Sequence, residues 1–307
     1  MENLDIVVPI VTPCTRAGAL DLAGLEAVCQ DLLGKGCTAI FIAGSTGRGP
    51  WFNRADRARM CRALADRVGE HAPLLAGCMA SGLPDMIENA CAMADSGAQV
   101  AVVTAPGYFN YNGSETETIL ARFADASPIP VTIYDIPGFA RTKLQKDVLL
   151  RLARHGNIIG IKDSSADFER FQQLLAGLRD RPGFCLLQGK ERLLAESLLL
   201  GAGGFVVSMV HIDPRPFVAL SQACRAGQTE LARRIQVSIC ELLDVVEACF
   251  ERRPETSTFF HLLNCILRRR GLCDNILLEH EGEGPLWLAG EAERALEICE
   301  AASSLGM

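Results

Sequence analysis

The chain has 307 residues, of which 49% are hydrophobic and 22% are charged. This balance is typical of a folded globular protein and excludes a disordered chain, which could not bury enough apolar surface. The net charge of -7 argues against a nucleic-acid partner, because binding to phosphates needs a surplus of lysine and arginine.

The N-terminus and the apolar runs indicate a cytoplasmic protein without a membrane partner. The first residues are acidic and lack the basic segment of a signal peptide, and no apolar run approaches the roughly 18 residues that span a bilayer. Most of the thirteen cysteines lie in apolar stretches. This placement favours free core thiols in a reducing compartment over disulfides.

Eight short apolar runs, each bounded by turn residues, are predicted to form strands. They occupy residues 5–13, 37–44, 73–78, 99–106, 129–136, 158–163, 185–189 and 204–208. Amphipathic stretches such as residues 55–68 and 115–126 separate them, which predicts parallel strands covered by helices. Eight such repeats predict a closed (β/α)8 TIM barrel over residues 1–225. An open doubly wound sheet is the alternative, although it usually has fewer strands and a glycine-rich turn after the first.

Residues 226–307 are predicted to be helical, with helical periodicity over residues 230–250, 256–271 and 290–306. No linker rich in proline, glycine or serine separates this segment from the preceding residues. We therefore expect a C-terminal three-helix extension that packs on the barrel, rather than an independent domain.

Lys162 is the first candidate for a reactive group, because the reactive groups of such barrels lie at the C-terminal ends of the strands. It ends the apolar run at residues 158–163, whereas the other four lysines have polar or turn neighbours. Burial disfavours an ammonium ion and favours the neutral amine that attacks a carbonyl. A structural ion pair with Asp163 or with a neighbouring carboxylate is the alternative interpretation.

Polar residues near the ends of other predicted strands suit the same chemistry. The three tyrosines, Tyr108, Tyr111 and Tyr134, all lie near strand ends, and a phenol beside a reactive lysine can transfer protons. We favour Tyr134 for that role. The turn at residues 44–47 offers two hydroxyls, those of Ser45 and Thr46, and backbone N–H groups that suit a carboxylate. A plain tight turn would use the same residues.

Three motifs together resemble the dihydrodipicolinate synthase / N-acetylneuraminate lyase family of pyruvate-type class I aldolases. They are GSTG from residue 44, YDIP from residue 134 and GIKDSS from residue 160, in that family's order and spacing. The resemblance covers essentially the full length. It implies that Lys162 forms a Schiff base, that Tyr134 transfers protons, and that Ser45 with Thr46 binds the carboxylate of a 2-oxo acid.

The same resemblance implies the remaining site residues and the partners. Tyr108 resembles the family tyrosine that completes a proton relay from a neighbouring subunit. Gly189 and Val206 match positions that line the pocket, Val206 through its backbone. Because family members are commonly tetramers built from tight dimers, we expect a homotetramer that binds a small 2-oxo acid and needs no cofactor and no metal.

Departures from the family pattern bear on the substrate. Arg48 stands where the family usually has glutamate, and Gly107 replaces an aromatic residue. Phe139 replaces an arginine that dihydrodipicolinate synthases carry for the carboxylate of the aldehyde, and Arg141 is a candidate to compensate. We therefore favour an aldolase or dehydratase that acts on pyruvate or a longer 2-oxo acid such as a 2-keto-3-deoxy sugar acid. A 4-hydroxy-tetrahydrodipicolinate synthase and an N-acetylneuraminate lyase are the alternatives.

Two hypotheses of other classes remain open from the sequence. A metal-dependent aldolase needs clustered ligands at strand ends, and of the five histidines only His211 is near one. The altered loop at Arg48 motivates a catalytically silent barrel that binds a 2-oxo acid as a sensor or partner protein.

Overall fold

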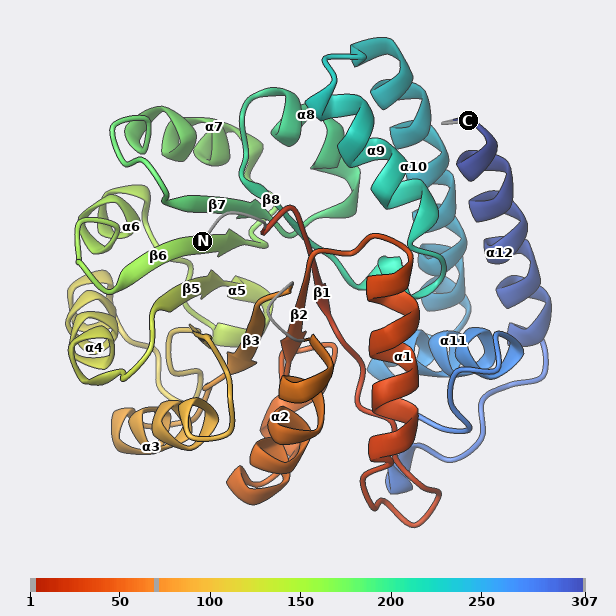
Figure 1. Ribbon diagram of the computed structural model, residues 1–307, viewed down its shortest axis with the longest axis horizontal. Helices are drawn as coiled ribbons and strands as arrows, with labels where there is room; N and C mark the ends of the chain where they lie inside the picture. The colour runs from red at the N-terminus through yellow and green to blue at the C-terminus, as the bar shows by residue number, and fades with distance from the viewer. Residues whose placement is uncertain (1–3, 69–71, 306–307) are drawn as a thin grey trace.

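The computed structural model describes residues 4–68 and 72–305, in which eight parallel strands form a closed barrel surrounded by helices (Figure 1). Each strand pairs with its neighbours in the sequence, and β1 also pairs with β8. The predicted TIM barrel is therefore confirmed, and the open-sheet alternative is wrong. The strands are β1 (Ile6–Pro9), β2 (Ala39–Ile42), β3 (Leu74–Gly77), β4 (Val100–Val103), β5 (Val131–Asp135), β6 (Ile158–Asp163), β7 (Cys185–Gln188) and β8 (Gly204–Val206).

Helices connect the strands and cover the outside of the barrel. They are α1 (Leu22–Gly34), α2 (Arg54–Val68), α3 (Leu83–Ala94), α4 (Gly113–Ala126), α5 (Pro137–Ala140), α6 (Lys146–Leu152), α7 (Phe168–Gly177), α8 (Leu194–Leu199) and α9 (Arg215–Arg225). Short 3-10 turns lie at η1 (Gly49–Trp51), η3 (Glu191–Leu193), η4 (Ser208–His211) and η5 (Glu279–Glu281). Helix α4 begins with a capping box, in which the side chains of Asn112 and Glu115 each accept a hydrogen bond from the other's backbone N–H.

The side chains of each strand alternate between the barrel interior and the helical layer, as the pleat of a strand requires. On β1, Val7 belongs to the inner cluster, while its neighbours Ile6 and Val8 belong to the outer core. Tyr134 on β5 also lies in the inner cluster, whereas the preceding Ile133 faces the helices. The same alternation directs Asp135, the next residue on β5, toward the helical layer.

Three helices follow the barrel: α10 (Thr229–Arg252), α11 (Thr256–Arg269) and α12 (Leu288–Ser304). Helix α10 packs against α9 and α12, and α11 packs against α12, at one side of the barrel (Figure 1). The predicted C-terminal helical extension is confirmed, and the division of the chain into residues 1–225 and 226–307 stays a prediction. Within residues 4–68 and 72–305, none of the helices has the length and apolar character to cross a membrane.

Candidate active site

Lys162 and Tyr134 lie side by side inside the barrel, as the sequence motifs led us to expect. They are register partners on β6 and β5, and both are buried. The Lys162 Nζ lies 3.9 Å from the centroid of the Tyr134 ring and 5.5 Å from that of Phe41. The ion pair of Lys162 with Asp163 is wrong, because Asp163 instead pairs with Arg170 at 2.8 Å.

The loop after β2 brings Ser45 to this pair. Its hydroxyl donates a hydrogen bond to the phenol oxygen of Tyr134 at 3.4 Å. The loop is pressed against the barrel, since a Cβ atom on Gly44 would lie 2.8 Å from the ring of Phe41. The backbone N–H groups of Ser45 and Thr46 have no acceptor among the described residues. Two free N–H groups and two hydroxyls suit the binding of a carboxylate.

The other two predicted pocket residues are Gly189, which directly follows β7, and Val206, the last residue of β8. The N–H of Gly189 donates to the carbonyl of Asp163 at 2.8 Å, directly beside the end of the strand that carries Lys162. A Cβ atom at Gly189 would lie 2.0 Å from the Oγ of Ser164 and 2.9 Å from the backbone oxygen of Asp163, so a larger residue would force the structure to shift there. Val206 is buried in the inner cluster at the end of β8.

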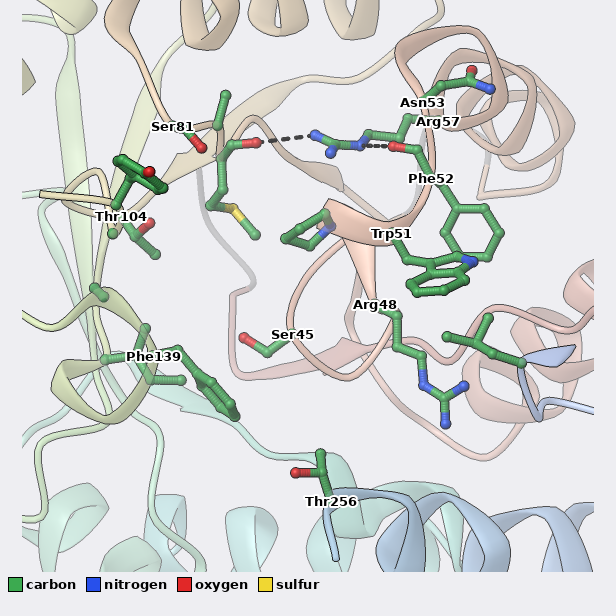
Figure 2. Close-up of a pocket in the computed structure, with 18 of the residues that line it drawn as sticks. Ser45, Arg48, Trp51, Phe52, Asn53, Arg57, Ser81, Thr104, Phe139 and Thr256 are labelled. Carbon is green, nitrogen blue, oxygen red and sulfur yellow. Dashed lines mark hydrogen bonds between the residues drawn. The ribbon is translucent and has the colours of Figure 1, made fainter. Parts of the chain in front are cut away.

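A cavity of about 1180 Å³ lies at the C-terminal ends of the strands, where a TIM barrel carries its site (Figure 2). The loops after β2, β3, β4 and β5 line it, together with residues of α11 and η5. Ser45 is part of this lining and contacts Tyr134, whereas Tyr134 and Lys162 themselves are not part of it. Ser45 therefore joins the buried pair to the cavity.

Tyr108 lines the cavity but does not reach the buried pair in this chain. Its side chain is 71% exposed and packs edge-to-face on Phe109, with ring centroids 4.9 Å apart. A relay role for Tyr108 therefore depends on a second copy of the chain. Phe139 also lines the cavity, while Arg141 is exposed and is not among the lining residues. The cavity wall thus carries the aromatic ring of Phe139, and Arg141, the candidate to compensate for the missing cation, does not line the cavity.

Arg48 ties the loop after β2 to the C-terminal extension. Its guanidinium donates to Glu281 on η5 at 2.6 Å and lies 3.5 Å from the centroid of the Phe260 ring on α11. Burial lowers the pKa of Arg48, and the Glu281 carboxylate opposes this effect. Arg48, which departs from the family pattern, therefore forms an ion pair with a carboxylate 233 residues away in the chain.

We expect Glu281→Gln to lower the free energy of unfolding by about 3 kcal/mol, because it leaves the Arg48 guanidinium, whose side chain is only 10% exposed, without its carboxylate partner. The matched control is Glu283→Gln, which breaks an ion pair with Arg16 whose side chains are 78% and 84% exposed. That control should cost less than about 1 kcal/mol. Urea denaturation measures both, and equal effects of the two substitutions would contradict the buried pair.

His211, the one histidine that the metal hypothesis could use, is engaged by the backbone. Its Nε2 accepts a hydrogen bond from the N–H of Val11 at 3.2 Å, and its Nδ1 lies 2.8 Å from the carbonyl of Ser208, to which it donates. Among residues 4–68 and 72–305, no group of three or more His, Cys, Asp or Glu side chains is arranged to hold a metal ion.

The burial of His211 predicts a loss of stability in acid. Burial lowers the pKa of His211 from 6.5 to about 4. Above pH 6.5 the imidazole is neutral in both states; as the pH falls to 4, the unfolded chain binds a proton that the folded chain excludes. We expect the free energy of unfolding to fall by about 3 kcal/mol from this group across that window. Urea denaturation at several pH values measures the fall, and a His211→Asn variant with an equally steep acid loss would contradict it.

Glu191 is a further candidate site residue, which the sequence motifs did not indicate. It begins η3, directly after the strand β7. Burial raises the pKa of its carboxyl group, and the charges of Lys190 and Lys162 oppose this rise. Its position two residues beyond the predicted strand at residues 185–189 was the available signal.

Comparison with known proteins places the chain in a family. The family model described as "Dihydrodipicolinate synthetase family" matches residues 2–276. The 4-hydroxy-tetrahydrodipicolinate synthase 1 of Streptomyces coelicolor is 32% identical over 239 residues, which cover 78% of this chain and 77% of the relative.

Solved structures give the same result. The dihydrodipicolinate synthase of Bacteroides thetaiotaomicron is 26% identical, with a TM-score of 0.87 over 96% of this chain and 98% of the relative. The enzyme of Acinetobacter baumannii, described as complexed with pyruvate, shares the fold at 23% identity and a TM-score of 0.86, over 96% of this chain and 98% of the relative. The resemblance seen in the three motifs is confirmed: the chain belongs to the dihydrodipicolinate synthetase family of lyase-type enzymes.

Proposed function

We propose that Lys162 forms an imine with the keto carbon of pyruvate, or of a longer 2-oxo acid, and that the imine then serves to cleave or form a bond in the substrate. The observation that carries this proposal is the pairing of Lys162 with Tyr134 in the barrel interior, 3.9 Å from amine nitrogen to ring centroid. Membership of a pyruvate-type family supports it.

In the proposed reaction the neutral amine of Lys162 attacks C2 of the substrate and forms a carbinolamine. The Tyr134 phenol passes a proton to the departing hydroxyl, so water leaves and the imine forms. The Tyr134 phenolate then takes the proton of the C4 hydroxyl, and the bond between C3 and C4 breaks, so that C4 leaves as an aldehyde. The electron pair of that bond moves into the protonated imine and gives an enamine, which the re-formed Tyr134 phenol can protonate. Protonation at C3 and hydrolysis release pyruvate and restore the free amine.

Ser45 and Thr46 are proposed to bind the carboxylate of the 2-oxo acid through their hydroxyls and backbone N–H groups. The contact of Ser45 with the Tyr134 phenol supports this arrangement, because it puts the carboxylate next to the group that moves protons. Gly189 and Val206 complete the proposed pocket, and each flanks the strand ends where the 2-oxo group would lie.

For the rest of the substrate we favour a 2-keto-3-deoxy sugar acid. The cavity wall offers hydroxyls from Ser81, Thr104 and Thr256, which suit the hydroxyls of a sugar chain (Figure 2). Phe139 lines the same wall at the position where dihydrodipicolinate synthases carry an arginine for the carboxylate of the aldehyde. The relative from Streptomyces coelicolor favours a second candidate, a 4-hydroxy-tetrahydrodipicolinate synthase.

A coupled assay for pyruvate separates these candidates. Pyruvate release from a panel of 2-keto-3-deoxy sugar acids would support the favoured reaction, and pyruvate consumption with aspartate semialdehyde would support the synthase. A product that keeps all the carbon atoms of the substrate but has lost one hydroxyl group as water would indicate a dehydratase. Stabilisation by pyruvate, with no turnover and no adduct after borohydride treatment, would overturn the enzymatic proposal in favour of a binding protein.

The proposed assembly is a homotetramer made of two tight dimers. Tyr108, Phe109 and Phe139 are large apolar side chains that stay exposed around the cavity in the single chain. A second copy that covers them would bury the aromatic surface and could bring its Tyr108 to the site. Analytical ultracentrifugation tests this assembly, and a monomer with full activity would contradict it.

The proposed location is the cytoplasm. All thirteen cysteines are free thiols, and nine of them are buried, as suits a reducing compartment.

A further inference from the structure

Behind the reactive pair lies a buried cluster of ions, formed by Asp135, Asp163 and Arg170, which we call the aspartate clamp. Arg170 projects from α7 and is 7% exposed. Its Nη2 donates to Asp135 Oδ2 at 2.5 Å and to Asp163 Oδ2 at 2.8 Å. Its Nη1 donates to the backbone carbonyl of Leu144. One guanidinium therefore holds the ends of two strands and the loop between α5 and α6.

The clamp is joined covalently to both reactive residues. Asp135 follows Tyr134 on β5, Asp163 follows Lys162 on β6, and the two pairs stand opposite each other in the strand register. Because consecutive side chains on a strand face opposite sides, Tyr134 and Lys162 face the interior while the aspartates face α7. Any shift of one strand end relative to the other would change the distance between amine and phenol.

The aspartates are further fixed by the backbone around them. Asp163 Oδ1 accepts a hydrogen bond from the N–H of Ser165 at 2.8 Å, and Asp135 Oδ1 accepts one from the N–H of Leu144 at 3.3 Å. The clamp is thus built from several directional bonds. Stability alone is a weak reason for such a cluster, since apolar residues of similar volume often stabilise a core equally well.

The clamp also balances charge next to Lys162. Burial opposes the charge of Arg170, but the two aspartates outweigh it and raise the pKa of the guanidinium. Burial also raises the pKa of the Asp135 carboxyl group, and the Arg170 guanidinium opposes this rise. Without that cation, the aspartates would lose their counter-charge one residue from the reactive pair. Two further titratable groups of the described residues interact with Lys162: the phenol of Tyr134 on β5 and the carboxyl group of Glu191, which begins η3.

We propose that Arg170 is a positioning residue for the reaction: it sets the spacing of Tyr134 and Lys162 and offsets the charge of the aspartates behind them, without touching the substrate. This inference rests on the proposed imine chemistry. It predicts that Arg170 governs the rate of imine formation and the pH at which that rate reaches half its maximum.

The test compares Arg170→Leu, Arg170→Lys and the double variant Asp163→Asn/Arg170→Leu by the rate of pyruvate-dependent borohydride inactivation across pH. For Arg170→Leu we expect a loss of about 10²-fold at neutral pH. The pH of half-maximal rate should also move upward, because loss of the Arg170 cation makes the surroundings of the reactive pair more negative and so favours protonated groups there. In the double variant, the pH of half-maximal rate should move back toward the wild-type value. In Arg170→Lys, it should equal the wild-type value. In all three variants, the pyruvate concentration that gives half-maximal rate should stay near that of the wild type.

The matched control is Arg151→Leu, which removes an arginine from an exposed ion pair with Glu117 on α4; rate and pH profile should not change. An Arg170→Leu protein that is folded and keeps the wild-type rate and profile would overturn the proposal. So would a loss of rate that only follows the fraction unfolded, with the half-maximal pH unmoved. If Arg170→Leu does not fold, the same rate and pH profile are compared between the wild type, Arg170→Lys and Asp163→Asn.

A second readout keeps the two proposals distinguishable. Modification of Lys162 by trinitrobenzenesulfonate, followed by peptide mass spectrometry at several pH values, needs no pyruvate. If the wild type forms no imine, the proposed function fails, while a shift of this labelling profile in Arg170→Leu still supports the clamp. An identical labelling profile in both proteins would overturn the clamp.

Discussion

Replacing Lys162 by arginine should abolish the pyruvate-dependent inactivation by borohydride and lower kcat on the order of 10⁴-fold or more. A guanidinium stays protonated in proteins and cannot form an imine with a keto group. Arginine keeps a long aliphatic stem, so the barrel interior should still fold around Phe41 and Tyr134. Steady-state kinetics and the trapping reaction both measure the loss.

The control for this experiment is Lys143→Arg, because Lys143 lies near the same end of the barrel but pairs with Asp167 at 2.8 Å on the surface. It should keep wild-type activity. If Lys162→Arg kept measurable trapping by pyruvate while its fold was intact, another amine would form the imine and the proposed chemistry would be wrong.

Tyr134→Phe should lower kcat by about 10²- to 10⁴-fold, the usual contribution of a positioned proton-transfer group. The substitution removes only the hydroxyl, so the edge-to-face contact with Phe41, at 6.4 Å between ring centroids, should remain. The bond from Ser45 to the phenol is lost as well. Because the amine is untouched, the variant should still trap pyruvate slowly with borohydride.

Tyr111→Phe serves as its control, since Tyr111 lies in the same part of the barrel end but packs near Phe109, with ring centroids 6.1 Å apart. Its activity should stay close to that of the wild type. Equal kinetics of Tyr134→Phe and the wild type would show that the phenol takes no part in proton transfer.

Most of the barrel was predictable because its strands are buried on both faces and therefore appear in the sequence as short apolar runs. The pairing of Lys162 with Tyr134 followed from the same reasoning: residues that end neighbouring parallel strands meet at one end of a closed barrel. The chain length between them did not matter, because the strand order fixed their places.

The contacts that complete the site could not be predicted, since they join residues far apart through side chains of ordinary type. Arg170 reaches Asp135 across 35 residues, and Arg48 reaches Glu281 across 233. Nothing in the local sequence of Arg48 indicates a buried carboxylate in the C-terminal extension. The exposure of Tyr108 was also unpredictable, because loop conformation depends on packing that hydrophobic periodicity does not describe.

The most direct test of the account is to treat the protein with saturating pyruvate and borohydride, digest it, and locate the adduct by mass spectrometry. The account predicts a single modified peptide, with one reduced pyruvate attached to Lys162, in an enzyme that has lost its activity. An adduct on any other lysine, or full inactivation without an adduct on that peptide, would contradict it.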